Sequence, residues 1–272
     1  MDTIMKTNRV SCYVLATSMV VLILSHALMA GAEPLRIGYF EVAPHAMAGP
    51  GDRAEGIAVV YFDLIAREMG LREYQFVKLP LNRLLVALEN SRIDMALLLA
   101  RNAERAAKFI YPADAFCMTK PSIAVSAENP LPKIRSIEDL EGLSFHETPE
   151  NYRAHTMRDQ RVKITPLAGG DFTRRCYAMI LAGRIDACYQ PDHYPIQFEA
   201  VSAAFASRIK ILYLPDPPIG LYSVFSKASA PVYVKPYEAA LAAVKRGQSY
   251  GAVFERFIGH YVEKDRARTD PK

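Results

Sequence analysis

Blocks of apolar residues with two different spacings alternate along this chain. Residues 35–40 and 74–79 have the short apolar runs of strands, whereas residues 57–69 carry apolar side chains at helical spacing. A predicted helix over 82–90 then leads to residues 93–100, which are almost continuously apolar. Strands buried on both faces have this composition, as in parallel sheets. The pattern therefore predicts an α/β fold with mainly parallel sheets.

The predicted helix over 57–69 has one apolar face, which we expect to be buried. Gly70 is suited to end this helix, because glycine readily adopts the left-handed conformation common at helix C-termini. The apolar face consists of Ile57, Val60, Tyr61, Leu64, Ile65 and Met69.

One helix-turn-strand unit occurs twice. Residues 84–97 read LLVALENSRIDMAL, and residues 178–189 read AMILAGRIDACY. In each copy a small residue, Ser91 or Gly183, ends the helix before the tripeptide Arg-Ile-Asp. Two copies of one unit predict two similar lobes.

The aspartates of the two tripeptides, Asp94 and Asp186, open their strands. Ligands of α/β sheets bind at the opposite, carboxyl ends of the strands. We therefore expect structural roles for both residues.

The second half of the chain continues the alternation. We expect strands over 121–126, 143–146, 162–166 and 209–214, and helices over 136–142, 151–160, 171–182, 232–244 and 250–261. Ser136 and Asp139 resemble a capping box, and Asp171 is suited to cap the helix that follows it. The proline-rich residues 215–218 predict a stiff, extended crossing.

The N-terminus has the features of a secretory signal peptide. Lys6 and Arg9 precede the apolar run over 10–28, and Ala30-Gly31-Ala32 supplies the small residues of a cleavage site. We expect cleavage after Ala32 and secretion into the periplasm. A retained membrane anchor is the alternative, since the apolar run is almost long enough to span a bilayer.

The charge and the remaining cysteines bound the function further. The chain has a formal net charge of +4, spread along the sequence, which argues against a nucleic-acid partner.

Cys117, Cys176 and Cys188 follow the signal peptide, and their spacing does not match a zinc site. Cys176 falls in a predicted helix and Cys188 in the next strand. A helix packs about 10 Å from its sheet, whereas a disulfide needs Cα atoms within about 7 Å. We therefore predict no bridge and read all three as small buried residues.

Several short motifs follow one another along the chain in an order that is typical of one protein family. They are Ile37-Gly38, Pro44-His45, Glu55-Gly56-Ile57, Phe62-Asp63-Leu64, the first Arg-Ile-Asp block, Glu104-Arg105, Phe109, Tyr111-Pro112, Ser136 to Gly142, the second Arg-Ile-Asp block and Phe225-Ser226-Lys227. In this order and spacing the chain resembles the family 3 extracellular solute-binding proteins, of the polar-amino-acid type that serves ATP-driven importers. The resemblance covers essentially all of the chain after residue 32.

The resemblance implies a two-lobed, type II periplasmic-binding-protein fold with two hinge crossings, near Lys120 and Pro215. Lobe one would comprise 33–120 plus 215–272, and lobe two 121–214. Closure of the lobes over a small polar or anionic solute would create the shape that an inner-membrane ABC permease recognises. We expect a monomer without a cofactor.

The resemblance also indicates ligand-binding residues. Arg105 matches the family arginine that holds the ligand carboxylate, a task suited to the paired donors of guanidinium. The family's hydroxyl residues before this arginine are replaced by Asn102 and Ala100, and its covering aromatic by Leu81. In lobe two the usual acidic residue is replaced by Pro191, with Asp192 next to it. Glu147-Thr148-Pro149 stands where a Gly-Thr or Gly-Ser loop is usual. These departures argue against a standard α-amino acid.

Further candidates surround the expected cleft. Arg83 and Arg101 with Arg105 would make it basic and favour an anionic solute, unless two of the three are solvated or paired with Glu89 and Glu104. The remaining ligand-binding candidates are Glu41, His45, Asn102, Glu147, Asp192, Tyr111 and Tyr189, the last two being equally compatible with a buried core position.

A binding protein is not the only function compatible with this sequence. Some family relatives are periplasmic dehydratases, and Glu41, Glu147 or His146 would be the acid or base. The sequence has no spaced nucleophile–base pair, metal-ligand cluster or phosphate-binding glycine loop, so we predict no enzymatic activity. An accessory or sensor role in another periplasmic system is the other alternative.

Overall fold

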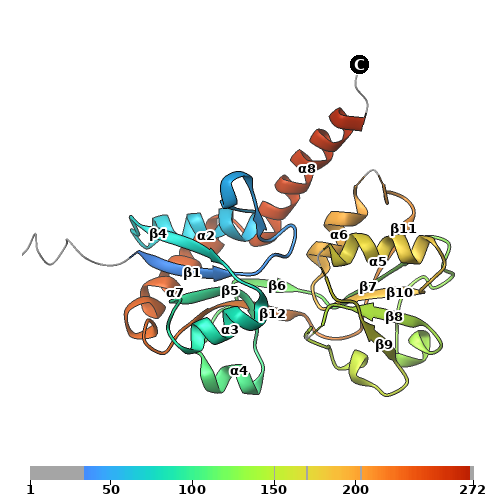
Figure 1. The fold of residues 1–272 in the computed structure, drawn as a ribbon, viewed down its shortest axis with the longest axis horizontal. Helices are drawn as coiled ribbons and strands as arrows, with labels where there is room; N and C mark the ends of the chain where they lie inside the picture. Colours follow the sequence, from blue (N-terminus) through green and yellow to red (C-terminus); the bar gives the residue numbers. More distant parts are fainter. Residues whose placement is uncertain (1–33, 150, 170, 203, 270–272) are drawn as a thin grey trace, which may run out of the picture. The chain divides into compact units, whose positions relative to one another are not determined.

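The structure, a computed structural model, describes residues 34–149, 151–169, 171–202 and 204–269. The chain divides into two units, Met1–Leu35 and Arg36–Lys272. The predicted signal peptide and its cleavage site after Ala32 lie outside the described residues. Figure 1 shows two groups of strands in the second unit, each flanked by helices.

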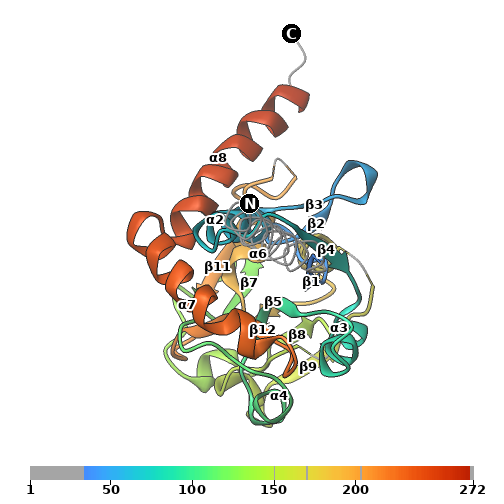
Figure 2. The ribbon, with the colours of Figure 1, turned by 90° about the vertical axis from the view of Figure 1, so that its left-hand side faces the viewer.

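The first sheet has the strand order β4-β1-β5-β12-β6. Its strands are β1 (Leu35–Tyr39), β4 (Tyr74–Lys78), β5 (Met95–Ala100), β6 (Cys117–Thr119) and β12 (Ile219–Phe225). β1 and β5 are parallel, and β12 runs antiparallel to both β5 and β6. The associated helices are α2 (Ile57–Glu68), α3 (Leu81–Glu89), α4 (Ala103–Lys108), α7 (Ala230–Gly247) and α8 (Tyr250–Thr269). In Figure 2, α7 and α3 lie to either side of β5 and β12.

The second sheet has the order β11-β7-β10-β8-β9. Its strands are β7 (Ser122–Ser126), β8 (Ser144–Glu147), β9 (Lys163–Pro166), β10 (Ala187–Gln190) and β11 (Ile209–Tyr213), with helices α5 (Phe172–Leu181) and α6 (His193–Ala200). β8 is parallel to β9 and β10, whereas β7 is antiparallel to β10 and β11. The short elements are β2 (Met47–Ala48), β3 (Ala54–Glu55) and the 3-10 turns η1 (Pro50–Asp52), η2 (Ile137–Leu140) and η3 (Thr156–Arg158).

Both faces of the second sheet are covered. Along β7, Ile123 and Val125 join one buried cluster, and Ala124 joins another. Cys188 of β10 belongs to the same cluster as Ala124. Since successive strand side chains point to opposite faces, this division shows a core on each side of the sheet. The consecutive apolar residues of β7 are explained by this double coverage.

The chain passes between the sheets twice. It leaves the first sheet after Thr119 and enters the second at Ser122, then returns between Tyr213 and Ile219. The predicted crossings near Lys120 and Pro215 fall in these two segments. The lobe boundaries drawn from them stay a prediction.

The two Arg-Ile-Asp units have the same local structure. Ser91 and Gly183 adopt left-handed φ values of 54° and 64°. Each donates its amide to the residue three positions earlier, and the next residue donates to the residue five positions before itself. Both helices therefore end in the same C-terminal motif.

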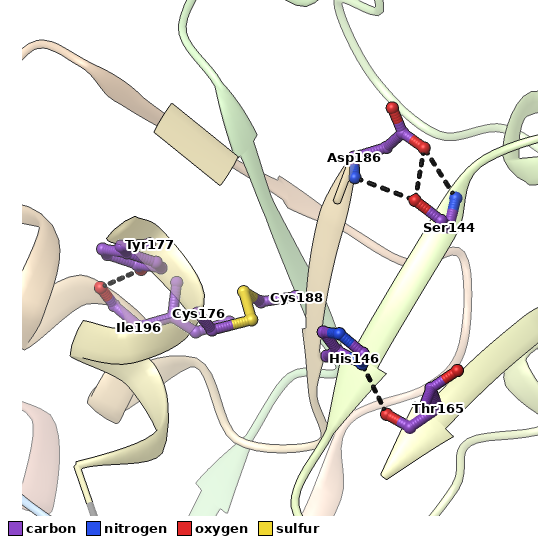
Figure 3. The surroundings of a disulfide bond; sticks show 8 residues. All are labelled: Ser144, His146, Thr165, Cys176, Tyr177, Asp186, Cys188 and Ile196. Carbon is purple, nitrogen blue, oxygen red and sulfur yellow. Dashed lines mark hydrogen bonds between the residues drawn. A yellow bond between two sulfur atoms is a disulfide. The ribbon is translucent and has the colours of Figure 1, made fainter. Parts of the chain in front are cut away.

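The aspartates of these units tie neighbouring parallel strands together at their amino ends. Asp94 accepts a 2.8 Å bond from the Arg36 backbone amide and bonds from the Arg36 side chain. Asp186 accepts bonds of 2.8 and 2.6 Å from the amide and hydroxyl of Ser144 (Figure 3). The contacts are those of structural residues, as the sequence predicted.

Cys176 and Cys188 form a disulfide, so the prediction against this bridge was wrong (Figure 3). Their Cα atoms are 6.1 Å apart. The expected spacing of about 10 Å applies to a helix axis, and an inward-facing Cα lies about 2.3 Å nearer the sheet. Both cysteines are fully buried, and small Ala124 lies in the same cluster. Cys117 is buried and unbridged.

Residues 151–160 do not form the predicted helix. Only the 3-10 turn η3 occurs there, because tertiary acceptors bind the amides that a helix would use. The amide of Ala154 donates to the Tyr189 hydroxyl, and that of Thr156 donates to Asp216. These bonds satisfy backbone amides that have no hydrogen-bond partner within a helix or strand.

Two smaller expectations were also wrong. Val60 was placed on the buried face of α2 but is 47% exposed, because α2 instead buries a face that includes Ala58 and Ala66. Ser136 makes no capping bond, and Asp139 accepts from the Arg135 amide instead. Within the described residues, no helix has the length and apolarity needed to cross a membrane.

Candidate functional site

A cavity of about 900 Å³ is lined by loops that follow strands of both sheets. The first sheet contributes the segment after β1, the β4–α3 connection and the end of β5. The second contributes the segment after β8, the start of α5 and the residues after β10. The carboxyl ends of parallel strands are where α/β sheets bind ligands. The acidic, basic and histidine residues of the lining are Glu41, His45, Lys78, Arg105, Asp171, Arg174, Asp192 and Glu199.

Arg105 lies on the cavity wall, on α4 just beyond the end of β5. Its Nη1 donates a 3.2 Å bond to the carbonyl oxygen of Ala100. No ion-pair partner of Arg105 occurs among the residues that the structure describes. The half-buried guanidinium thus has donors left for an anion.

Asn102 caps α4 and does not line the cavity. Its Oδ1 accepts a 2.8 Å bond from the Arg105 amide, so it positions the turn that carries Arg105. Tyr111, also outside the lining, donates from its hydroxyl to the carbonyl of Ala100 at 3.1 Å. Burial raises the pKa of Tyr111 to about 12, which keeps its hydroxyl protonated.

Arg83 and Arg101 do not line the cavity with Arg105. Both side chains are exposed, and the Arg101 guanidinium lies 5.6 Å from the centre of the Tyr111 ring. The ion pairs considered with Glu89 and Glu104 are absent among the described residues, because both acids pair with Lys108.

His45 is fully buried and uses both ring nitrogens. Nδ1 lies 2.5 Å from the Tyr250 hydroxyl, and Nε2 lies 2.7 Å from Oδ2 of Asp192. Asp192 also accepts bonds from the Thr119 hydroxyl at 2.7 Å and the Tyr194 amide at 3.0 Å. Burial alone would raise the pKa of Asp192, but the His45 charge and these hydrogen bonds lower it below its usual value.

Two acidic candidates have different surroundings. Glu41 is exposed at the cavity, accepts from the Ala48 amide at 3.1 Å and lies 3.8 Å from Lys78. Glu147 is buried outside the lining, with one carboxylate oxygen bound by two nitrogens of Arg153. Tyr189 is a core residue of the second sheet.

The structure adds lining residues that the sequence reasoning missed. Arg174 donates to Glu199 at 2.9 Å, joining the start of α5 to α6. Asn151 donates to Gln190 at 3.4 Å. Gln190 is the last residue of β10, so its place at a strand's carboxyl end was the signal that could have found it.

The wall of the cavity is not basic, which corrects the expected convergence of three arginines. Its cations are Lys78, Arg105 and Arg174, with His45 as a fourth only when protonated, and its anions are Glu41, Asp171, Asp192 and Glu199. Arg83 lies on α3 and Arg101 in the loop after β5, and neither residue lines the cavity. Within the described part of the chain, no group of three or more His, Cys, Asp or Glu residues could hold a metal ion.

Residues 35–260 match the model of the bacterial extracellular solute-binding proteins, family 3. The chain belongs to this family. No curated relative matches the sequence. Family 3 members are binding proteins, and the chain is accordingly a solute-binding protein and not an enzyme.

Solved structures show the same two-lobed, type II fold as this family 3 protein. The GluR0 ligand-binding core from Nostoc punctiforme, in complex with L-glutamate, is 18% identical with a TM-score of 0.66, covering 82% of this chain and 98% of that one. An ancestral cationic amino acid solute-binding protein is 18% identical with a TM-score of 0.66, over 83% and 95%. The arginine-specific periplasmic binding protein of Salmonella typhimurium is 16% identical with a TM-score of 0.63, over 83% and 99%.

Proposed function

We propose that this family 3 protein is the periplasmic substrate-binding component of an ABC-type importer. It binds a small polar solute, an amino acid or a related carboxylate, by hinge closure. Residues 33–120 plus 215–272 form lobe one and residues 121–214 form lobe two. The permease in the inner membrane recognises the closed form.

The observation that carries this proposal is the state of Arg105. Its guanidinium lines a cavity between polar groups of both sheets, and one donor is fixed on the Ala100 carbonyl. A carboxylate docked on the remaining donors would form charge-assisted bonds, which are about twice as strong as neutral ones. Contacts made by such a ligand to Gln190 and Asn151 would then favour closure, since only differential contacts shift a conformational equilibrium.

The test is calorimetric titration of the purified protein with amino acids, dicarboxylates and other small carboxylates. We expect Arg105→Ala to weaken binding by about 100-fold, because a charge-assisted pair contributes roughly 1.5–3 kcal/mol. Arg83→Ala, which removes the same charge from an exposed position, is the matched control and should bind like the wild type. Equal affinity of the wild type and Arg105→Ala would remove Arg105 from the site.

Export and closure have separate tests. N-terminal sequencing of the protein from the periplasm should begin at Glu33. Small-angle scattering should show a smaller radius of gyration with ligand, and an unchanged radius at saturation would contradict hinge closure.

A further inference from the structure

The acidic groups on the cavity wall already have basic side chains as neighbours within the protein. Asp192 is bound by His45, Glu199 by Arg174, and Glu41 lies near Lys78. Asp171 is exposed, and its charge raises the pKa of Arg174, as does that of Glu199 to a greater extent. Among the described lining residues, Arg105 is the lysine or arginine without an ionic partner.

These internal pairs differ in strength, and burial decides which of them matter. Glu41 and Lys78 are 3.8 Å apart, with side chains 56% and 43% exposed. Water and salt screen such a pair, so a ligand could displace it at little cost. The side chains of Asp192 and Glu199 are each only 12% exposed. A cationic ligand group that needed either carboxylate would have to break a partly or fully desolvated contact.

Asp192 is the more completely occupied of the two. Its Oδ2 accepts from His45 at 2.7 Å, and its Oδ1 accepts from the Thr119 hydroxyl and the Tyr194 amide. These bonds form with neutral or protonated imidazole, since one ring nitrogen donates in either state. The rings of Tyr194 and Tyr250 pack against the His45 imidazole and against each other.

The backbone holds His45 in this place. Its carbonyl oxygen accepts the Ala58 amide at 2.8 Å, and the Pro44 carbonyl accepts the Ile57 amide at 3.0 Å, both at the start of α2. Asp192, for its part, is fixed as the N-cap of α6. Neither residue can turn toward a ligand without losing these bonds or their shared contact.

From this arrangement we infer that the ligand is a carboxylate that carries no ammonium or guanidinium group, because the carboxylate of Asp192 is already occupied by His45. The inference rests on the proposed function and narrows it. Arg105 binds the carboxylate, and the lining offers neutral polar groups, Asn151 and Gln190, to the rest of the molecule. An amino group could pair only with Glu41 and Asp171, which are exposed and therefore screened by water, because Asp192 and Glu199 are already bound.

The test uses pairs of compounds that differ by one amino group. The pairs are propanoate and L-alanine, succinate and L-aspartate, and glutarate and L-glutamate, each titrated calorimetrically at pH 7. We expect the member without the amino group to bind about 10- to 100-fold tighter, as expected for a desolvated charge left without a hydrogen-bond partner. Equal or tighter binding of the amino members would overturn the inference.

Variants separate this inference from the proposed function. His45→Ala removes the imidazole and its hydrogen bond to Asp192, which frees one carboxylate oxygen, so the preference against the amino members should shrink. His146→Gln, in β8 and bonded to the Thr165 carbonyl, is the control and should keep it. Arg105-dependent binding of the amino members that equals or exceeds that of the members without an amino group would leave the proposed function standing and overturn only the inference. If no carboxylate of either kind bound, both would be wrong, and neither result depends on the folding of His45→Ala.

Discussion

Gly56 lies directly against the carbonyl oxygen of His45. A Cβ atom at Gly56 would be 2.4 Å from that oxygen and 2.7 Å from the carbonyl oxygen of Pro44. Gly56 also has a φ of 123°, which side chains rarely tolerate. The residue that fixes the start of α2 thus also allows the close approach that holds His45 at the cavity.

Replacing this glycine should therefore be costly. We expect Gly56→Ala to lower the free energy of unfolding by about 2–5 kcal/mol, from backbone strain of roughly 1–3 kcal/mol and steric overlap of similar size. Urea unfolding measures this loss. Gly70→Ala is the control, because Gly70 has a φ of 67° but nothing within 4 Å of the added atom. It should cost only about 1–2 kcal/mol, and equal losses in the two variants would refute the packing argument.

The Cys176–Cys188 bridge should stabilise the second sheet. It closes a loop of 12 residues in sequence separation, for which the chain-entropy model gives about 3 kcal/mol. We expect dithiothreitol to lower the urea midpoint of the wild type. The double variant Cys176→Ala/Cys188→Ala should start from the lower midpoint and not respond to reductant. A wild-type midpoint that reductant leaves unchanged would contradict the bridge.

Asn102 was predicted as a ligand contact, and its cap geometry leads to a different expectation. Asn102→Ala should lower stability by about 1 kcal/mol through loss of the α4 cap. Ligand affinity should fall with it, because the capped amide belongs to Arg105. Asn102→Asp, which can also cap, should restore both quantities in thermal and calorimetric measurements. Restored stability without restored affinity would point instead to direct contact between Asn102 and the ligand.

The Ser144–Asp186 contact predicts a pH effect. Hydrogen bonds from the Ser144 side chain and backbone lower the pKa of Asp186 in the folded protein. Its stabilising contribution is therefore complete above the unfolded-state pKa of about 3.9 and is lost as the pH falls through the lower folded value. We expect Ser144→Ala to raise the Asp186 pKa in carboxyl NMR titrations and to flatten the fall of stability between about pH 4 and pH 2. Ser126→Ala, on β7, should change neither, and an unshifted Asp186 titration in Ser144→Ala would refute the assignment.

The sequence predicted those parts of the fold whose determinants are close together in the chain. The Arg-Ile-Asp units are the clearest case, because the helix end, the turn and the first strand residue lie within a few positions of one another. Ser91 and Gly183 adopt the left-handed conformation that such a turn needs. The strand β5 was also predictable from its apolar sequence, since every residue of Met95–Ala100 is buried.

Other elements were not predicted correctly, because contacts with distant residues overrode the local preference for a helix or strand. Residues 151–160 have a helical composition, yet Tyr189 and Asp216 bind the amides of Ala154 and Thr156. The strand β6 and the helix α6 were not predicted either. Their residues meet only in the fold, where Thr119 of β6 bonds with Asp192 at the start of α6.

The sequence was sufficient to predict the α/β class, the repeated unit, the family resemblance, and the position of Arg105 after a buried strand. These features depend on the spacing of residues and on contacts between residues close together in the sequence. The charges available at the cavity, in contrast, could be identified only once the lobes and their contacts were known. The fold pairs His45 with Asp192 across 147 positions and leaves Arg101 on the Tyr111 ring. Whether a charged side chain already has a partner depends on which residues the fold places beside it, and the local sequence does not show this.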